Sequence, residues 1–268
     1  MKTNISKTSI LRFFAFAAII LALFPSCRGK TAKMANEIRY GFATEPQTLD
    51  PLYPGNTADG RSILFNIFEG LVKPDTEGIL RPCIAESWTI EQNGLVYNFT
   101  LREDMRFHDG SLLDSADVKF SLETAAASGF DGLTMIKEVT APDTRHVTVT
   151  LKSPDPEFLP YMTIAVVKAG NEEREKNVIG TGPFYVESYT KQRDIVMRKF
   201  DDYWMRRLRE PKDIPLLDKV TVVFFANSDA LMMALRGGSI DGVNLTGSPA
   251  IMRRKVVLSN LGDSSPSP

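Results

Sequence analysis

Residues 87–106 have the sequence SWTIEQNGLVYNFTLREDMR and contain the clearest structural signal in the chain. The pair Asn93-Gly94 is typical of a tight hairpin turn, because both central residues of a type I′ turn need a positive φ. Trp88 and Ile90 precede the turn, and apolar and polar residues alternate through Leu95–Leu101 after it. This alternation predicts an antiparallel hairpin with one face against a core.

The sequence around this hairpin predicts further short strands and two helices. Apolar side chains at helical spacing predict one helix within residues 60–71. Asp114 or Ser115 can cap a second helix that runs to about Ala127. The predicted strands are a pair within 72–80, and single strands at 136–139 and 146–151. Together these segments predict an α+β unit with a meandering sheet.

The rest of the folded chain predicts a second sheet. Strands are expected at 37–43, 184–189, 194–200 and 240–245, and at 219–225, where a continuous apolar run is typical of a strand buried on both faces. Asn227 or Ser228 caps a helix that ends at Gly237-Gly238. A strand, a helix and a strand at this spacing predict a crossover in a parallel or mixed sheet. The expected fold class is therefore α+β, or mixed α/β.

The first 26 residues predict a secretory signal. Lys2, Lys7 and Arg12 precede the uncharged apolar run Phe13–Phe24, which is shorter than the roughly 20 residues that a spanning helix needs. Without these 26 residues the chain is mildly acidic. The whole chain has a formal net charge of -1, so its charge does not indicate a nucleic-acid partner. Residues 27–36 are polar and basic, and predict a tether.

Two cysteines are present, Cys27 and Cys83. The sequence Leu23-Phe24-Pro25-Ser26-Cys27 resembles a bacterial lipobox, so Cys27 is predicted to be lipidated and to anchor the protein to a membrane. Cleavage nearby, with Cys27 a bystander, is the alternative, and a Cys27–Cys83 bridge is disfavoured because Cys27 lies in a leader. Cys83 is expected to be a small buried residue.

Motifs of common enzymes are absent from the sequence. There is no HExxH, CxxC, GxSxG or Walker lysine loop. His108-Asp109 could form half of a metal site and Asp201-Asp202 a carboxylate pair, but solvated turns explain both more simply. Catalysis needs a nucleophile, a base and an orienting group within reach of one another. No catalytic residue, metal ligand or cofactor is therefore predicted.

Nine short motifs occur in the order found in one family. They are Thr44–Pro51 (TEPQTLDP), Ile67–Leu71 (IFEGL), Pro82–Trp88 (PCIAESW), Tyr97–Arg102 (YNFTLR), Phe107–Gly110 (FHDG), Ser115–Leu122 (SADVKFSL), Gly180–Phe184 (GTGPF), Asp202–Trp204 (DYW) and Gly238–Gly242 (GSIDG). The chain thereby resembles the bacterial extracellular solute-binding proteins of family 5, the periplasmic dipeptide-, oligopeptide- and nickel-binding proteins of ABC importers. Cys83 and Ser239 depart slightly from the family's usual residues.

The resemblance implies a type II periplasmic-binding-protein fold, whose two lobes close on a ligand by a hinge. Members of the family are nearly twice as long, so this chain is expected to be an N-terminal half without the second lobe. The resemblance implies a signal at 1–26, a tether at 27–36, a discontinuous first lobe at 37–60 and 165–245, an inserted subdomain at 61–164, and a tail at 246–268.

The resemblance also implies a function, which is capture of peptides or related small solutes outside the inner membrane for delivery to ABC permease subunits. Two segments resemble family regions near the cleft, and the implied ligand-binding residues are Thr44, Glu45, Pro46, Gln47, Thr48, Leu49, Gly180, Thr181, Gly182 and Pro183. Simple turns are the alternative for both segments. A degenerate or partner-dependent lipoprotein half that no longer transports is the second functional hypothesis, and an enzyme on this scaffold is the third.

Overall fold

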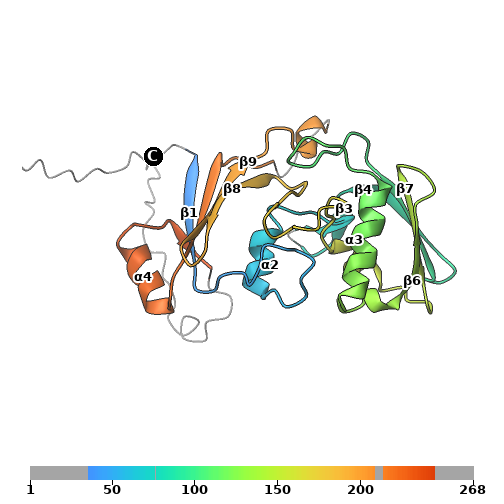
Figure 1. Ribbon diagram of the computed structural model, residues 1–268, viewed down its shortest axis with the longest axis horizontal. Helices are drawn as coiled ribbons and strands as arrows, with labels where there is room; N and C mark the ends of the chain where they lie inside the picture. The colour runs from blue at the N-terminus through green and yellow to red at the C-terminus, as the bar shows by residue number, and fades with distance from the viewer. Residues whose placement is uncertain (1–35, 76, 209–213, 245–268) are drawn as a thin grey trace, which may run out of the picture. The chain divides into compact units, whose positions relative to one another are not determined.

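The computed structural model describes residues 36–75, 77–208 and 214–244 (Figure 1). The predicted signal, Cys27 and the 246–268 tail lie outside these residues. Within the described ranges, no helix has the length and apolar character needed to cross a membrane.

A five-stranded mixed sheet joins both ends of the described chain (Figure 1). Its order is β11 (Gly242–Val243), β1 (Glu37–Phe42), β10 (Lys219–Phe224), β9 (Asp194–Lys199) and β8 (Phe184–Thr190). Strand β1 pairs in parallel with β10 and β11, and the remaining pairs are antiparallel. The predicted strand–helix–strand unit in a mixed sheet is confirmed, with α4 (Ser228–Arg236) capped by Asn227.

Strand β10 differs from its prediction in one respect. A strand buried on both faces was expected, yet only Thr221 and Val222 are buried and the residues on either side are half-exposed. The expectation of burial on both faces was therefore wrong, and the following helix α4 contacts β1 and β11.

The second sheet is antiparallel and has the order β4 (Ala85–Glu91), β5 (Val96–Leu101), β7 (His146–Leu151) and β6 (Ile136–Thr140). Helix α3 (Ser115–Ala127) contacts β6 and β7 (Figure 1). Its predicted cap is confirmed, because the Asp114 carboxylate accepts from Ala116 N at 2.8 Å. The core-facing side chains are at most 1% exposed: Tyr97, Phe99, Leu101, Val147, Val149 and Leu151. The shorter elements are β2 (Val72–Pro74), β3 (Leu80–Pro82), and the 3-10 helices η1 (Leu133–Met135), η2 (Leu159–Thr163) and η3 (Trp204–Arg207).

The predicted hairpin is confirmed, but its turn lies one residue earlier than expected. Gly94 N donates to Glu91 O at 3.1 Å, so Gln92 and Asn93, with φ of 49° and 57°, are the central residues. Gly94 follows with φ of 86°. A Cβ at Gly94 would lie 2.6 Å from the backbone of Asp155, so glycine is needed here for close approach as well as for its φ.

Helix α2 (Ala58–Leu64) is shorter than the predicted 60–71 helix. The carbonyls of Asn66 and Ile67 accept from Phe184 N at 3.1 Å and from Gly182 N at 2.9 Å. These long-range bonds take the backbone out of the helical pattern, so the second half of the prediction was wrong.

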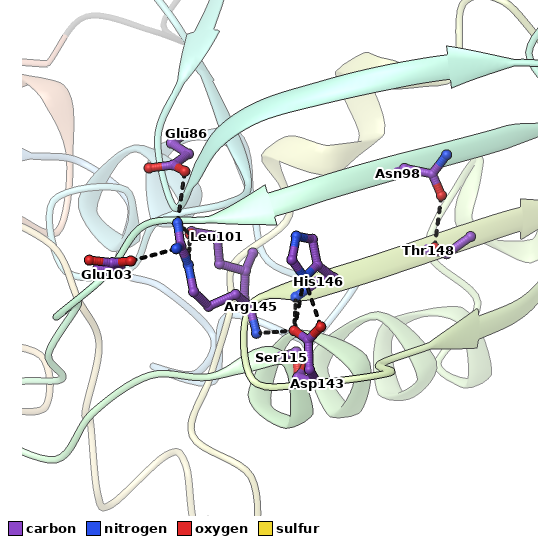
Figure 2. A network of polar contacts seen from close by, with 9 residues as sticks. All are labelled: Glu86, Asn98, Leu101, Glu103, Ser115, Asp143, Arg145, His146 and Thr148. Atoms are coloured by element: carbon purple, nitrogen blue, oxygen red, sulfur yellow. Dashed lines mark hydrogen bonds and ion pairs between the residues drawn. The ribbon is translucent and has the colours of Figure 1, made fainter.

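Arg145 connects the ends of β4, β5 and β7 (Figure 2). Its guanidinium donates to Leu101 O at 3.1 Å and to Glu86 at 2.8 Å, and it also pairs with Glu103. Asp143 accepts from the backbone N of Arg145 at 2.8 Å and of His146 at 2.9 Å. The network fixes the β6–β7 turn.

We expect Gly94→Ala to destabilise the fold by more than Gly170→Ala. Gly170 has a similar φ of 76° but open space around its Cβ position, so it isolates the backbone strain of roughly 1–2 kcal/mol. At Gly94 the clash with Asp155 adds to that strain. Urea unfolding of both variants measures the difference, and equal losses would contradict the close approach.

Candidate functional site

The predicted segment Gly180–Pro183 is packed into the protein. Thr181 is 0% exposed, and both glycines are buried. A Cβ at Gly180 would lie 2.0 Å from Ile67 O, so a side chain there would separate the two segments. The loop therefore holds the segment after α2 in place. Gly180, Thr181 and Gly182 are all buried, so none of them is exposed to solvent.

His108 clamps this loop through both ring nitrogens. Gly180 N donates to Nδ1 at 3.2 Å, so Nδ1 is the acceptor, and Nε2 donates to Gly182 O at 3.0 Å. The ring also packs edge-on against Phe200, with centroids 5.0 Å apart. Burial lowers the pKa of His108 to about 4, so the ring is neutral at pH 7.

Glu69 is a buried carboxylate that ties three segments together. It accepts from Tyr203 Oη at 2.7 Å, Trp204 Nε1 at 2.9 Å and Thr181 Oγ1 at 3.1 Å. Burial raises the pKa of Glu69, although the bonds from Tyr203 and Trp204 oppose that shift. Cys83 lies beside it as a free thiol that is 0% exposed, and burial raises its pKa, as expected of an inert core residue.

The other predicted segment, Thr44–Leu49, follows β1 and mixes buried with exposed residues. Leu49 is 1% exposed and Pro46 is buried, whereas Thr44 and Gln47 face solvent. Glu45 accepts from Tyr189 Oη at 2.6 Å and from Gln192 N at 2.8 Å, which ties the segment to the β8–β9 hairpin. Thr48 Oγ1 accepts from Asp50 N at 3.1 Å. Among the described hydrogen bonds, none joins this segment to Gly180–Pro183.

A cavity of about 570 Å³ lies next to these segments. Three stretches of chain line it: Pro51, Pro54, Arg61, Leu64, Phe65 and Phe68; Gly129, Phe130, Asp131 and Leu133; and Pro160, Tyr161, Thr163, Ile164 and Ala165. Its volume and its apolar walls with few polar groups are typical of small-molecule sites. The sequence analysis missed this cavity.

Phe65 and Tyr161 form the aromatic wall of the cavity, and the ring of Tyr161 packs on buried aromatic residues. Tyr161 packs on Phe158 with centroids 5.7 Å apart, and Phe158 packs on the buried Tyr97 at 5.3 Å. Gly132, with φ of 77°, lets the ring of Tyr161 approach, since a Cβ there would lie 2.2 Å from the ring. Tyr161 and Phe65 nevertheless remain 40% and 57% exposed. Exposed aromatics on a fixed wall are suited to contact with a ligand.

The described residues place a serine, an aspartate and a histidine close together without forming a catalytic triad. His146 Nδ1 lies 2.8 Å from Asp143 (Figure 2), but Ser115 is buried and its hydroxyl donates to the Asp143 carbonyl. In a catalytic triad the serine hydroxyl forms a hydrogen bond with the histidine ring, and Ser115 instead donates to a backbone carbonyl.

The carboxylates of the other two predicted polar turns form ion pairs with basic side chains. Asp109 pairs with Lys168 at 2.6 Å, and Asp201 pairs with Arg206 at 3.2 Å. In the part of the chain that the structure describes, no group of three or more His, Cys, Asp or Glu residues is arranged to hold a metal ion.

Comparisons with known proteins identify the family. Residues 80–259 match the model of the bacterial extracellular solute-binding proteins, family 5 middle region. The chain belongs to this family. The glutathione-binding protein GsiB of Escherichia coli O1:K1 / APEC is 27% identical over 89% of the chain and 50% of its own length.

Solved structures confirm the fold class. AgaA of A. tumefaciens R10, in complex with agropinic acid, has a TM-score of 0.66 at 32% identity over 76% of this chain and 43% of its own. AppA of Bacillus subtilis, in complex with a nonapeptide, has a TM-score of 0.68 at 25% identity over 76% and 43%. The fold is the mixed α/β, type II periplasmic-binding-protein fold that the resemblance implied. The chain spans about half the length of these relatives.

The stability of the protein should fall as the pH drops from 6.5 towards 4. The unfolded chain binds a proton at His108 near pH 6.5, whereas the folded protein does so only near pH 4. The stabilisation that comes from the neutral His108 ring is therefore complete above pH 6.5, and it is lost progressively as the pH falls towards 4. Urea unfolding at pH 7 and pH 5 should show a smaller loss in His108→Gln, which has no ionisable ring. An equal loss in both proteins would contradict this linkage.

Replacement of Glu69 should distinguish a bonding role from simple space filling. Glu69→Leu leaves three buried donors without their acceptor and should cost about 3 kcal/mol of unfolding free energy. Glu69→Gln keeps an acceptor for Trp204 and Thr181 and should cost about 1 kcal/mol. Chemical denaturation gives both values, and a Leu variant as stable as the original would show that the bonds contribute little.

Proposed function

We propose that the protein captures peptides or related small solutes in the 570 Å³ cavity, as the binding component of an ABC importer. The observation that carries this proposal is the exposure of two aromatic rings that line the cavity. Phe65 is 57% exposed, and Tyr161, which packs on Phe158, is 40% exposed. An aromatic ring stabilises a fold when it is buried, and these two rings are exposed. Their position at a cavity is best explained by a ligand that covers them.

The relatives support this class of solute. GsiB is named for glutathione, AppA was solved with a nonapeptide and AgaA with agropinic acid. Peptides present an apolar or aromatic side chain beside charged and hydrogen-bonding groups. The cavity has matching parts, with the aromatic wall beside the charged side chains of Arg61 and Asp131. No catalytic role is proposed.

The predicted binding segments have different parts in this proposal. Thr44–Leu49 leads directly into Pro51 on the cavity wall, and its exposed residues Thr44 and Gln47 lie outside the cavity lining. Gly180–Pro183 acts through its bond to Ile67, which fixes the floor residue Phe68. The first lobe comprises 37–60 and 165–245, with 61–164 inserted into it, and a second lobe completes the site.

The proposed location is outside the inner membrane. The signal at 1–26 exports the chain, and lipidation of Cys27 anchors it, with residues 28–36 as a tether. The ABC permease is then the partner that receives the solute.

Phe65→Ala should weaken solute binding roughly tenfold, because the loss of one aromatic contact removes about 1.4 kcal/mol. Leu112→Ala is the matched control, since Leu112 is 56% exposed but lies outside the cavity. Differential scanning fluorimetry of the full chain with a di- to pentapeptide library measures the response. A peptide-dependent rise in the unfolding temperature that both variants keep equally would place the site elsewhere, and no rise in the unaltered protein would contradict the proposed function.

A further inference from the structure

The end of the five-stranded sheet at which β1 begins carries charges and apolar side chains that the proposed solute site does not use. The strand register aligns Glu37 at the start of β1 with Lys219 at the start of β10, and Lys219 with Arg198 near the end of β9. The segments 200–208 and 214–218, which follow β9 and precede β10, therefore lie at this end of the sheet (Figure 1). We call this surface the tether end, because the predicted tether joins β1 here.

The first described residue is bonded to the segment that precedes β10. Asn36 O accepts from Asp218 N at 2.9 Å, and Asn36 Nδ2 donates to the Asp218 carboxylate at 3.0 Å. Only residues 28–35 separate this point from Cys27 in the sequence. An extended chain spans at most about 3.5 Å per residue, so a membrane that holds a lipid on Cys27 lies within about 30 Å of Asn36.

Two leucines are exposed at the tether end. Leu216, two residues before Asp218, is 81% exposed, which is the highest value among the large apolar side chains that the structure describes. Leu208, which directly follows η3, is 37% exposed. The interface of a lipid bilayer takes up apolar side chains that lie beside cations. These leucines are therefore suited to insert at such an interface.

Two cations without a carboxylate partner lie at η3, next to Leu208. Arg207 is exposed and donates to the backbone carbonyl of Asp104 at 2.6 Å, and Lys73 Nζ lies 3.7 Å from the sulfur of Met205. Neither cation forms an ion pair with any residue that the structure describes. Both charges are therefore available to an anionic group.

The balance of charge at the tether end is positive. Arg102 adds a third cation, which stacks over the Trp204 ring at 4.4 Å from its centroid, and exposed Asp104 and Asp202 offset part of this charge. The tether contains no acidic residue and three basic ones: Arg28, Lys30 and Lys33. Since the chain as a whole has a formal net charge of -1, an anionic surface attracts this end in preference to the rest of the protein.

We propose that the tether end is a docking surface for anionic phospholipids, and this proposal rests on the lipid anchor and the location proposed above. Lys73 and Arg207 pair with headgroup phosphates, while Leu208 and Leu216 insert between the headgroups. Cations bind phosphate by charge-assisted hydrogen bonds, and their attraction to the surface falls off within about 10 Å. Pro51 on the cavity wall follows the opposite end of β1, so docking leaves the cavity open to a solute.

Binding of the full chain to phospholipid vesicles tests the two kinds of contact separately. Cys27→Ser in every protein prevents acylation, so that the leader 1–26 is the same in all of them. The probes are vesicles of phosphatidylcholine and vesicles that also contain phosphatidylglycerol, and co-sedimentation measures the partition coefficient for each. The charge contribution should disappear at about 1 M salt, where the Debye length is about 3 Å.

The variants should give two different signatures. Arg207→Gln and Lys73→Gln should each weaken binding to the anionic vesicles about fivefold and leave binding to the neutral vesicles unchanged. Leu216→Gln should weaken binding to both kinds of vesicle, because apolar insertion does not depend on lipid charge. Lys152→Gln and Met233→Gln are the matched controls and should change neither. Lys152 is exposed and donates to a backbone carbonyl, as Arg207 does, and Met233 is 72% exposed on α4.

The outcomes separate the docking surface from solute capture. Arg207 and Lys73 variants that bind anionic vesicles as tightly as the unaltered surface, or no more weakly than the Lys152 control, would overturn the docking surface. Mass spectrometry that finds Cys27 without lipid in protein taken from the producing cells would remove the anchor and overturn it too. Solute capture stands or falls separately on the response to the peptide library, which Arg207→Gln should leave unchanged.

Discussion

The buried carboxylate of Glu69 is the interaction on which the other parts of the structure depend. A charge that is removed from water is tolerated only where hydrogen bonds replace its hydration, and Thr181, Tyr203 and Trp204 supply those bonds. The donors lie more than a hundred residues along the chain from Glu69. One side chain therefore fixes the return of the chain from the antiparallel sheet towards β8.

The same residue also shapes the cavity. Its neighbour Phe68 is part of the cavity wall, and Glu69 O accepts from Val166 N at 2.8 Å, next to the lining residues Ile164 and Ala165. His108 holds the same Gly180–Pro183 loop through its bonds to Gly180 and Gly182. Burial lowers the pKa of His108 and raises the pKa of Glu69, so it favours the neutral form of each group. The hydrogen bonds of both groups hold the Gly180–Pro183 loop in one conformation.

Features with local causes could be predicted from the sequence, and features with long-range causes could not. The Asp114 cap and the alternation in Leu95–Leu101 depend on neighbouring residues, and both were predicted correctly. The segment after α2 is bonded to Gly182, and Gly94 in the hairpin turn packs against Asp155, and a local pattern reveals neither contact. The cavity is assembled from three separate stretches, so no single stretch of sequence indicated it.

The positions of the motifs suggest how such a protein can keep its fold while its ligand changes. Glu69, Thr181 and Trp204 belong to the motifs by which the sequence resembles its family. All three are buried, and Thr181 and Trp204 both donate hydrogen bonds to the Glu69 carboxylate. Arg61 and Asp131, which face the cavity, lie outside those motifs. Substitution at these two positions changes the charge offered to a solute but breaks none of the bonds to Glu69. Solute preference in this half of the site can therefore vary with little effect on the network that holds the cavity together.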